Sequence, residues 1–141
     1  MASYSIIGAG IAGLSLALEL EEAGINARII EYRDRIGGIH ILYPGLDSFI
    51  DRARHRANIV SAAAIRVNGR TYELRGKNYV ELRDAVVATG FRVATLPELG
   101  VYGDRPAGIY PFHAVLDLIH YGLLPGKRIV IYGDNVHAAL L

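Results

Sequence analysis

The chain opens with three short segments whose hydrophobic pattern changes in a fixed order. Residues 4–7 form an apolar run typical of a strand that is buried on both faces, and residues 27–32 form a second run of this kind. Between them, residues 10–23 place apolar side chains such as Leu14 and Leu18 on one helical face. A strand, a helix and a strand joined by short links predict a right-handed parallel βαβ unit.

The middle of the chain changes to a period of two. Three runs alternate apolar and charged side chains, and the turn pair Asn68-Gly69 joins the first two of them. The apolar members are Ile65, Val67, Tyr72, Leu74, Val80 and Leu82. We therefore expect a small antiparallel meander over about residues 62–83, with one wet face. A helix over residues 46–57, with Asp47 as its N-cap, is expected before it.

The last part of the chain returns to longer apolar runs. Residues 84–88 are expected to rejoin the main sheet, because the run ends in Thr89-Gly90. A loop rich in proline and glycine covers residues 96–111, a helix is expected over 112–121, and residues 129–132 form a further apolar run that predicts a buried strand.

These elements predict the fold class and its division. The fold is α/β, with a Rossmann-like domain whose parallel sheet is built on the βαβ unit and carries the antiparallel meander. This domain is expected over residues 1–110. Residues 111–141 are expected to hold a linker helix and the start of a second, incomplete nucleotide-binding fold.

A glycine-rich loop lies between the first strand and the first helix. Gly8, Gly10 and Gly13 form the pattern G-x-G-x-x-G. The first glycine permits a sharp turn, the second lets a pyrophosphate approach the backbone, and the third lets the helix pack closely on the sheet. The first helical turn, at Ile11 and Ala12, directs free N–H groups toward a bound phosphate.

A carboxylate at the end of the second predicted strand makes the glycine loop more specific evidence for nucleotide binding. Glu31 stands where an acidic side chain accepts hydrogen bonds from a ribose hydroxyl pair. The distance between loop and carboxylate favours a dinucleotide, although a mononucleotide phosphate remains an alternative. The other alternative is a glycine-rich turn in an unrelated α/β protein, with Glu31 as a surface carboxylate.

Composition narrows the classes of protein. The chain has 141 residues, of which 52% are hydrophobic and 21% are charged, and its net charge of +1 predicts no nucleic-acid partner. It lacks cysteine, which excludes disulfides and thiolate metal sites and suits a cytoplasmic protein. The five histidines show no spacing typical of a metal site. Because glutamine and tryptophan are also absent, we expect a thermophilic source.

The uncharged stretch over residues 1–18 is not expected to be a signal peptide or a membrane span. It lacks the basic start of a signal peptide, and its glycines interrupt the apolar run before a spanning length of about 20 residues is reached. A strand, a turn and an amphipathic helix account for it better.

The chain resembles the two-dinucleotide-domain flavoproteins of the glutathione-reductase structural type, the pyridine nucleotide-disulfide oxidoreductases. The resemblance rests on the glycine loop, on Glu31, on Arg35-Ile36-Gly37-Gly38, and on Ala88-Thr89-Gly90 followed by Leu96-Pro97. It implies FAD as the cofactor, with the cation of Arg35 near the pyrophosphate. The cofactor-binding residues that we predict are Gly8, Gly10, Ile11, Ala12, Gly13, Glu31, Tyr32, Arg35, Gly38, Ala88, Thr89 and Gly90.

The turn Pro125-Gly126-Lys127-Arg128 and the apolar run after it look most like the α subunits of sarcosine oxidase and dye-linked proline dehydrogenase. Three departures from the family limit this resemblance. The chain lacks the paired cysteines of a disulfide reductase, and Asn135 replaces a glycine in the second loop, which argues against NAD(P) binding there. The chain also ends within the second fold. Alternatively, Asp134 itself contacts the flavin side and closes a shortened flavoprotein.

The sequence thus predicts an FAD-binding oxidoreductase domain or subunit, with an amine or imino-acid dehydrogenase as the first reading. An NAD(P)H-dependent electron-transfer flavoprotein and a non-catalytic FAD-binding module or fragment are the alternatives. We expect the chain alone to bind FAD but to turn over poorly, since a partner subunit or further sequence would complete the flavin site. A homo-oligomer is a further option, and the catalytic residues, the substrate and the electron acceptor stay open.

Overall fold

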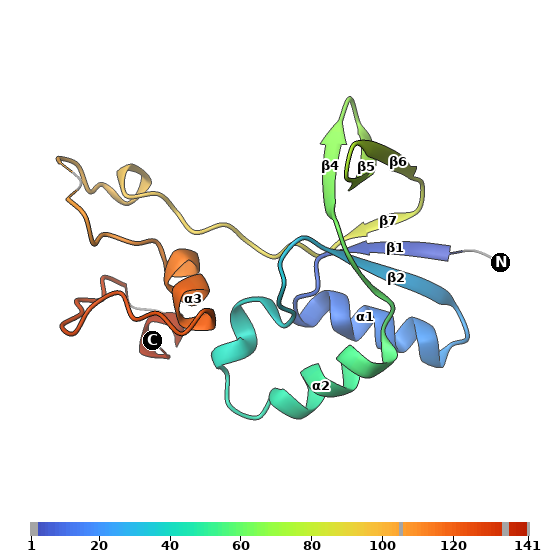
Figure 1. Ribbon diagram of the computed structural model, residues 1–141, viewed down its shortest axis with the longest axis horizontal. Helices are drawn as coiled ribbons and strands as arrows, with labels where there is room; N and C mark the ends of the chain where they lie inside the picture. The colour runs from blue at the N-terminus through green and yellow to red at the C-terminus, as the bar shows by residue number, and fades with distance from the viewer. Residues whose placement is uncertain (1–2, 105, 134–135, 141) are drawn as a thin grey trace. The chain divides into compact units, whose positions relative to one another are not determined.

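The computed structural model describes residues 3–104, 106–133 and 136–140 (Figure 1). The chain divides into two compact units, Met1–Gly90 and Phe91–Leu141. All the predicted cofactor-binding residues lie in the first unit.

The first unit is built on a four-stranded sheet with the order β3-β2-β1-β7. The strands are β1 (Ser3–Ile7), β2 (Asn26–Glu31), β3 (Ile59–Ser61) and β7 (Ala85–Val87). Every neighbouring pair is parallel, which confirms the predicted α/β fold. The sequence pattern missed β3, because its three residues are too few to reveal a period.

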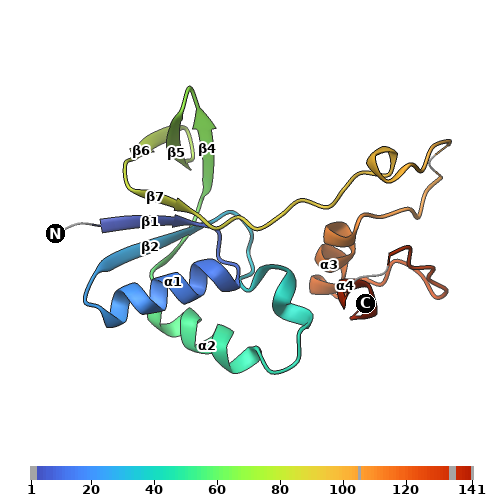
Figure 2. The same ribbon diagram turned by 180° about the vertical axis from the view of Figure 1, so that it is seen from behind.

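Two helices cover one face of this sheet. They are α1 (Ile11–Glu22) and α2 (Asp47–Arg56), and Figure 2 shows them side by side below the strands. The buried core that they form with the sheet contains Ile6, Ala9, Leu14, Ala17, Leu18, Ile29 and Ala53. The predicted N-cap of α2 was wrong by one residue, since Leu46 caps the helix and Asp47 is its first helical residue. There the Asp47 carboxylate can still interact favourably with the helix dipole.

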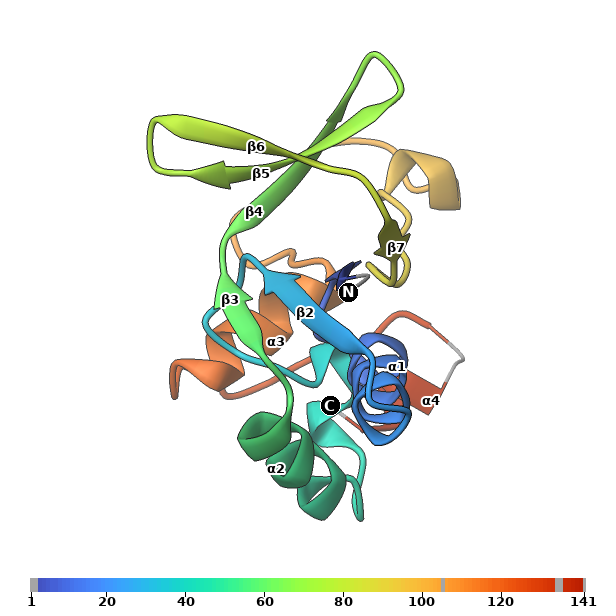
Figure 3. The ribbon, with the colours of Figure 1, turned by 90° about the vertical axis from the view of Figure 1, so that its right-hand side faces the viewer.

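The predicted meander covers the opposite face of the sheet (Figure 3). Its strands are β4 (Ala63–Val67), β5 (Arg70–Arg75) and β6 (Asn78–Leu82), all antiparallel to their neighbours. Asn68 and Gly69 have φ angles of 49° and 80°, which suit a two-residue hairpin turn with two left-handed positions. The meander carries the chain from β3, on one side of β1, to β7 on the other.

The meander does not have the one apolar face and one wet face that the alternation predicts, because both faces carry apolar and charged side chains. Glu73 lies opposite Ala64 and Val80, and this face looks toward the main sheet, with the side chain of Glu73 fully buried. Ile65 and Tyr72 lie opposite each other on the outer face. The prediction of one wet face was wrong because the register places Val80 and Leu82 of β6 opposite Glu73 and Thr71 of β5, on the other face from Tyr72 and Leu74.

Glu73 links the meander to the main sheet through arginines. Arg28 of β2 approaches the Glu73 Oε2 atom with its Nη2 atom at 2.8 Å, and Arg75 donates its Nε–H to Oε1 over 2.5 Å. Arg28 also donates its Nε–H to the hydroxyl of Ser5 over 3.4 Å. The hydrogen bond from Arg75 and the charge of Arg28 hold the pKa of Glu73 below its ordinary value, against the opposing effect of burial.

The second unit contains a 3-10 turn, η2 (Pro97–Leu99), and the helices α3 (Phe112–His120) and α4 (Val136–Ala139). The expected helix is confirmed in α3. The strand expected over residues 129–132 is wrong: this stretch has no regular structure, and Val130 is 96% exposed. An apolar run forms a strand only where a neighbouring strand satisfies its backbone groups, and none of the described residues pairs with it.

The described residues 129–133 thus lack the strand expected there, and the assignment of residues 111–141 to the start of a second nucleotide-binding fold stays a prediction. The predictions for Asp134 and Asn135 lie outside the described residues. In the part of the chain that the structure describes, no helix is long and apolar enough to cross a membrane.

Candidate functional site

The loops that follow β1, β2 and β7 meet at the carboxyl edge of the parallel sheet. The chain begins in the middle of this sheet, extends to one side through β2 and β3, and then crosses to β7 on the other side. The strand order therefore reverses beside β1. In open α/β sheets, ligands bind outside the carboxyl ends of the strands at this switch point. The glycine loop follows β1 at this place.

Two of the three glycines in the loop are required by the protein itself. Gly8 has a φ of +106°, and a Cβ atom there would lie 2.6 Å from the carbonyl oxygen of Ala88. A Cβ atom on Gly13 would lie 2.0 Å from the carbonyl oxygen of Gly8, because the helix packs directly on the loop. Both contacts match the mechanical roles that the motif predicts.

No contact within the protein requires a glycine at position 10. Its φ is −74°, a value that any residue adopts, and a Cβ atom there would meet no protein atom within 4 Å. The glycine that the motif places here therefore has no cause in the protein's own packing. This is the place where the motif predicts a pyrophosphate.

The first turn of α1 begins at this open position. Leu14 donates the first helical hydrogen bond to the carbonyl oxygen of Gly10, over 2.9 Å. The N–H groups of Ile11, Ala12 and Gly13 therefore precede the intrahelical ladder, as they do in every α-helix. Together with the positive end of the helix dipole, these N–H groups can bind an anion.

Glu31 turns its carboxylate back over the glycine loop. Its Oε2 atom accepts the backbone N–H of Ala9 over 2.7 Å, and its Oε1 atom accepts the N–H of Arg33 over 2.9 Å. The predicted carboxylate and the predicted phosphate loop are thus brought together by a direct hydrogen bond. Each carboxylate oxygen has a further lone pair for a ligand hydroxyl.

Tyr32 follows Glu31 and is 67% exposed. The Arg33 guanidinium carbon lies 5.3 Å from the centroid of the Tyr32 ring, and the Arg33 Nε–H donates to the Tyr32 hydroxyl over 2.8 Å. Arg33 was absent from the predicted set. Its position two residues after the carboxylate, at the same edge of the sheet, is the signal that could have identified it.

The loop after β2 is attached to the glycine loop. Gly37 donates its N–H to the carbonyl oxygen of Ala9 over 2.8 Å and forms a parallel bridge with Gly10. A Cβ atom on Gly38 would lie 3.4 Å from the Cα atom of Gly10. Arg35 lies in this loop and is only 7% exposed, so protein contacts hold most of its side chain. Its contact with a phosphate stays a prediction.

The element Ala88-Thr89-Gly90 follows β7. Ala88 donates its N–H to the carbonyl oxygen of Ile7 over 2.8 Å, and its own carbonyl oxygen lies against Gly8. Thr89 and Gly90 are exposed at the same edge of the sheet. The structure thus gathers all the predicted segments at one edge, while their contacts with a cofactor stay predictions.

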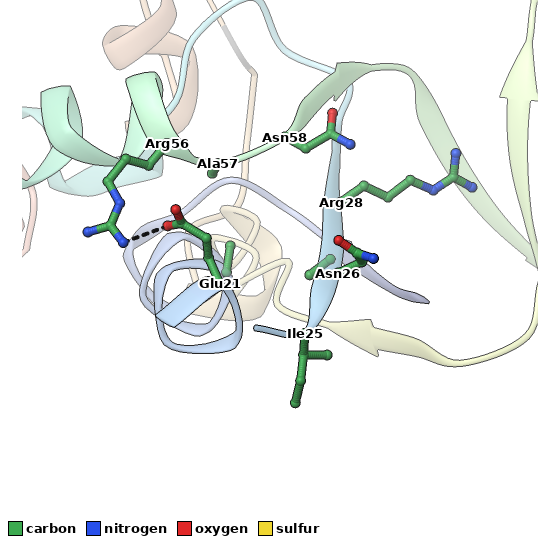
Figure 4. A pocket seen from close by; sticks show the side chains of 9 residues that line it. Glu21, Ile25, Asn26, Arg28, Arg56, Ala57 and Asn58 are labelled. Carbon is green, nitrogen blue, oxygen red and sulfur yellow. Dashed lines mark ion pairs between the residues drawn. The ribbon is translucent and has the colours of Figure 1, made fainter. Parts of the chain in front are cut away.

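One surface hollow of about 400 Å³ lies elsewhere, beside the end of α1 and the start of β2 (Figure 4). It is lined by Ala17, Glu21, Ile25, Asn26, Ala27, Arg28, Arg56, Ala57 and Asn58. Glu21 and Arg56 form an ion pair of 2.8 Å at its rim. The hollow is at the amino end of β2, away from the switch point. Among the described residues, no three acidic, histidine or cysteine side chains gather to hold a metal ion.

Parts of the chain are similar to known proteins. Residues 6–47 match the family model described as NAD(P)-binding Rossmann-like domain. A stretch of 38 residues is 53% identical to amine oxidase [flavin-containing] A of Sus scrofa. The matched stretch is 27% of this chain and 7% of the pig protein.

The fold also resembles that of solved structures. Thioredoxin reductase of T. acidophilum matches with a TM-score of 0.50 and 20% identity, over 66% of this chain and 36% of the reductase. Bacillithiol disulfide reductase of Staphylococcus aureus matches with a TM-score of 0.49 and 21% identity, over 68% of this chain and 46% of that chain. The chain spans less than half the length of these proteins. Its first unit is a Rossmann-like domain whose opening segment is similar to the NAD(P)-binding Rossmann-like domain family.

Proposed function

We propose that the first unit binds FAD by its ADP half and serves a flavin-dependent oxidoreductase. The observation that carries this proposal is the open space at Gly10, which the packing of the protein does not require. A pyrophosphate in that space would accept hydrogen bonds from the first turn of α1, and the adjoining ribose would donate its hydroxyls to Glu31.

Two features favour FAD over NAD(P) as the dinucleotide. The Arg35-Ile36-Gly37-Gly38 segment and the Ala88-Thr89-Gly90 element resemble the FAD domains of two-dinucleotide flavoproteins. The similar stretch of the pig protein comes from an enzyme named as flavin-containing. NAD is the second candidate, because the matching family model is described as NAD(P)-binding. The negative charge of Glu31 would repel a 2′-phosphate and so disfavours NADP.

Bound FAD would supply the redox chemistry, and the chain's residues would hold and orient it. The substrate class that we propose is an amine or imino acid, which the short similarity to an amine oxidase supports. The narrower link to sarcosine oxidase and proline dehydrogenase stays a prediction from the sequence alone. Electron transfer from NAD(P)H and a non-catalytic FAD module are the alternative functions.

Competition between nucleotides tests the binding mode. The purified chain is titrated with FAD while flavin fluorescence is followed, and ADP or FMN is added as competitor. Because the proposed grip acts on the ADP half, ADP should displace FAD and FMN should not. Equal displacement by FMN, or no binding of FAD at all, would contradict the proposal. Binding of NAD in preference to FAD would favour the second candidate.

Reduction of the bound flavin then distinguishes the functions. The FAD-loaded chain is mixed anaerobically with sarcosine, proline or NADH, and the visible flavin absorbance is recorded. Bleaching by sarcosine or proline supports the amine or imino-acid substrate class, and bleaching by NADH alone supports the electron-transfer alternative. We expect slow bleaching, since a partner subunit or further sequence is proposed to complete the flavin side.

A further inference from the structure

The hairpin between β4 and β5 ends in Asn68 and Gly69, which are both exposed. Val67 and Arg70 are the last paired residues before this two-residue turn. Asn68 has a φ of 49°, and in the part of the chain that the structure describes it is the one residue other than glycine with a positive φ. A Cβ atom on Gly69 would meet no protein atom within 4 Å. The proposed cofactor site uses neither residue, and the pair carries a reactivity of its own.

Asparagine is a thermolabile residue, because its side-chain amide can be lost as ammonia. The backbone nitrogen of Gly69, once it has given its proton to the solvent, attacks the Cγ atom of Asn68 and forms an N–C bond. The bond from Cγ to the amide nitrogen breaks, and that nitrogen leaves as ammonia with a proton taken from water. Water then opens the five-membered succinimide at either carbonyl carbon, which yields aspartate or isoaspartate. Nothing is oxidised or reduced, and water is the co-reactant.

The residue after an asparagine decides how readily this ring closes. Gly69 has no Cβ atom beside its nitrogen, and its backbone rotates freely. The other four asparagines precede alanine, isoleucine, tyrosine and valine, whose side chains crowd the attacking nitrogen; they are Asn26, Asn58, Asn78 and Asn135. Asn68 is therefore the asparagine that the sequence singles out, and the hairpin places it at an exposed tip.

The hairpin tip opens at a low cost in free energy. Ring closure requires rotation of the Asn68 backbone, which the closed two-residue turn restricts, so the reaction proceeds through a transient opening of the tip. Ile65 and Val67 beside the turn are 41% and 46% exposed, so little apolar burial holds this end together. The buried Glu73, which pairs with Arg28, lies toward the other end of β5. Opening of the tip therefore leaves the anchored part of the meander in place.

From these features we propose that Asn68 converts spontaneously to aspartate and isoaspartate in the folded chain. Aspartate retains the turn, because it adopts the left-handed conformation about as well as asparagine does. It adds a negative charge between Arg66 and Arg70, and the formal net charge of the chain falls from +1 to zero. Isoaspartate lengthens the main chain of the turn by one methylene group, so Val67 and Arg70 no longer close a two-residue loop.

Peptide mapping by mass spectrometry tests this proposal, because each conversion raises the mass of a peptide by about one dalton. The folded chain is incubated at 37 °C and pH 7.4, samples are digested at mildly acidic pH, and the peptide around each asparagine is followed. Asn78 is the matched internal control, because it is also exposed and begins β6 after the next turn, but precedes Tyr79. We expect Asn68 to convert at least about tenfold faster than Asn78. A rise from pH 7 to pH 8 should accelerate the conversion, since the backbone nitrogen must lose its proton.

Asn68→Gly removes the reactive amide and keeps a residue that favours a positive φ in the turn. Circular dichroism verifies that this variant and the incubated unaltered chain are folded. On ion exchange, a more acidic form should accumulate in the unaltered chain and be absent from Asn68→Gly, which supports the proposed site. A folded chain in which Asn68 keeps its amide, converts no faster than Asn78, or converts only after urea has unfolded the chain overturns the proposal.

Discussion

The backbone N–H of Ala9 donates a 2.7 Å hydrogen bond to the Oε2 atom of Glu31. Ala9 lies in the loop after β1, and Glu31 is the last residue of the neighbouring parallel strand β2. One bond thus fixes the predicted ribose carboxylate against the predicted phosphate loop before any ligand binds. Glu31 therefore has two roles in this account, because it shapes the glycine loop and is proposed to hold the sugar.

Replacement of this carboxylate should affect both roles. Glu31→Gln introduces an NH2 group that faces a backbone N–H, so at least one of the two hydrogen bonds is lost. We expect the free energy of unfolding to fall by about 1–3 kcal/mol and FAD affinity to weaken at least about tenfold. Urea denaturation and FAD titration measure these effects. A variant with unchanged FAD affinity would remove Glu31 from the proposed site.

Gly13 provides a prediction about the fold alone. Gly13→Ala would place a Cβ atom 2.0 Å from the carbonyl oxygen of Gly8, and neither backbone segment can move without disturbing β1 or α1. We expect a loss of about 3 kcal/mol or more in the free energy of unfolding. Thermal unfolding measures this loss. Stability equal to that of the unaltered chain would show that the helix does not pack on the loop so closely.

Glu73 predicts how stability depends on pH. Its pKa is lowered in the folded chain, so it contributes stability that is fully present above the ordinary glutamate value of 4.5. This contribution is lost as pH falls through the lower pKa of the folded state. Urea denaturation between pH 3 and pH 7 should therefore show falling stability below about pH 4.5.

Glu73→Gln separates this contribution from those of other carboxylates. The variant should be less stable than the unaltered chain at pH 7 by about 1–3 kcal/mol, and the difference should shrink toward pH 3. Glu81→Gln is the matched control on the neighbouring strand, because the ion pair of Glu81 with Arg70 is exposed and adds little. An equal difference at every pH would contradict the proposed role of the Glu73 charge.

Local sequence patterns predicted most of the first unit. The glycine loop, the βαβ unit, the Asn68-Gly69 hairpin and the return strand each depend on short-range steric and hydrophobic requirements, and the structure contains them all. Local patterns could not predict which face of the meander points toward the main sheet. It depends on the ion pair between Glu73 and Arg28, whose partners are 45 residues apart in the chain.

In the second unit, the sequence pattern predicted a strand that the structure does not contain. Residues 129–132 have the β-branched and aromatic composition of a buried strand, yet a strand also requires a paired edge. Composition reports only the first requirement. In the candidate site, the position of Arg33 two residues after Glu31 could be read from the sequence, whereas its contact with the Tyr32 ring follows only from side-chain geometry.

Gly10 is proposed to be a glycine because a bound dinucleotide approaches its backbone, and an FAD titration of Gly10→Ala tests this most directly. The new methyl group meets no protein atom within 4 Å, so the variant should fold, with stability lowered only by the cost of an alanine at the N-cap of α1. Gly126→Ala is the matched control, with its nearest contact at 3.8 Å. We predict that Gly10→Ala weakens FAD binding by about tenfold or more while Gly126→Ala does not. Equal FAD affinity of the folded Gly10→Ala variant and the unaltered chain would contradict the account.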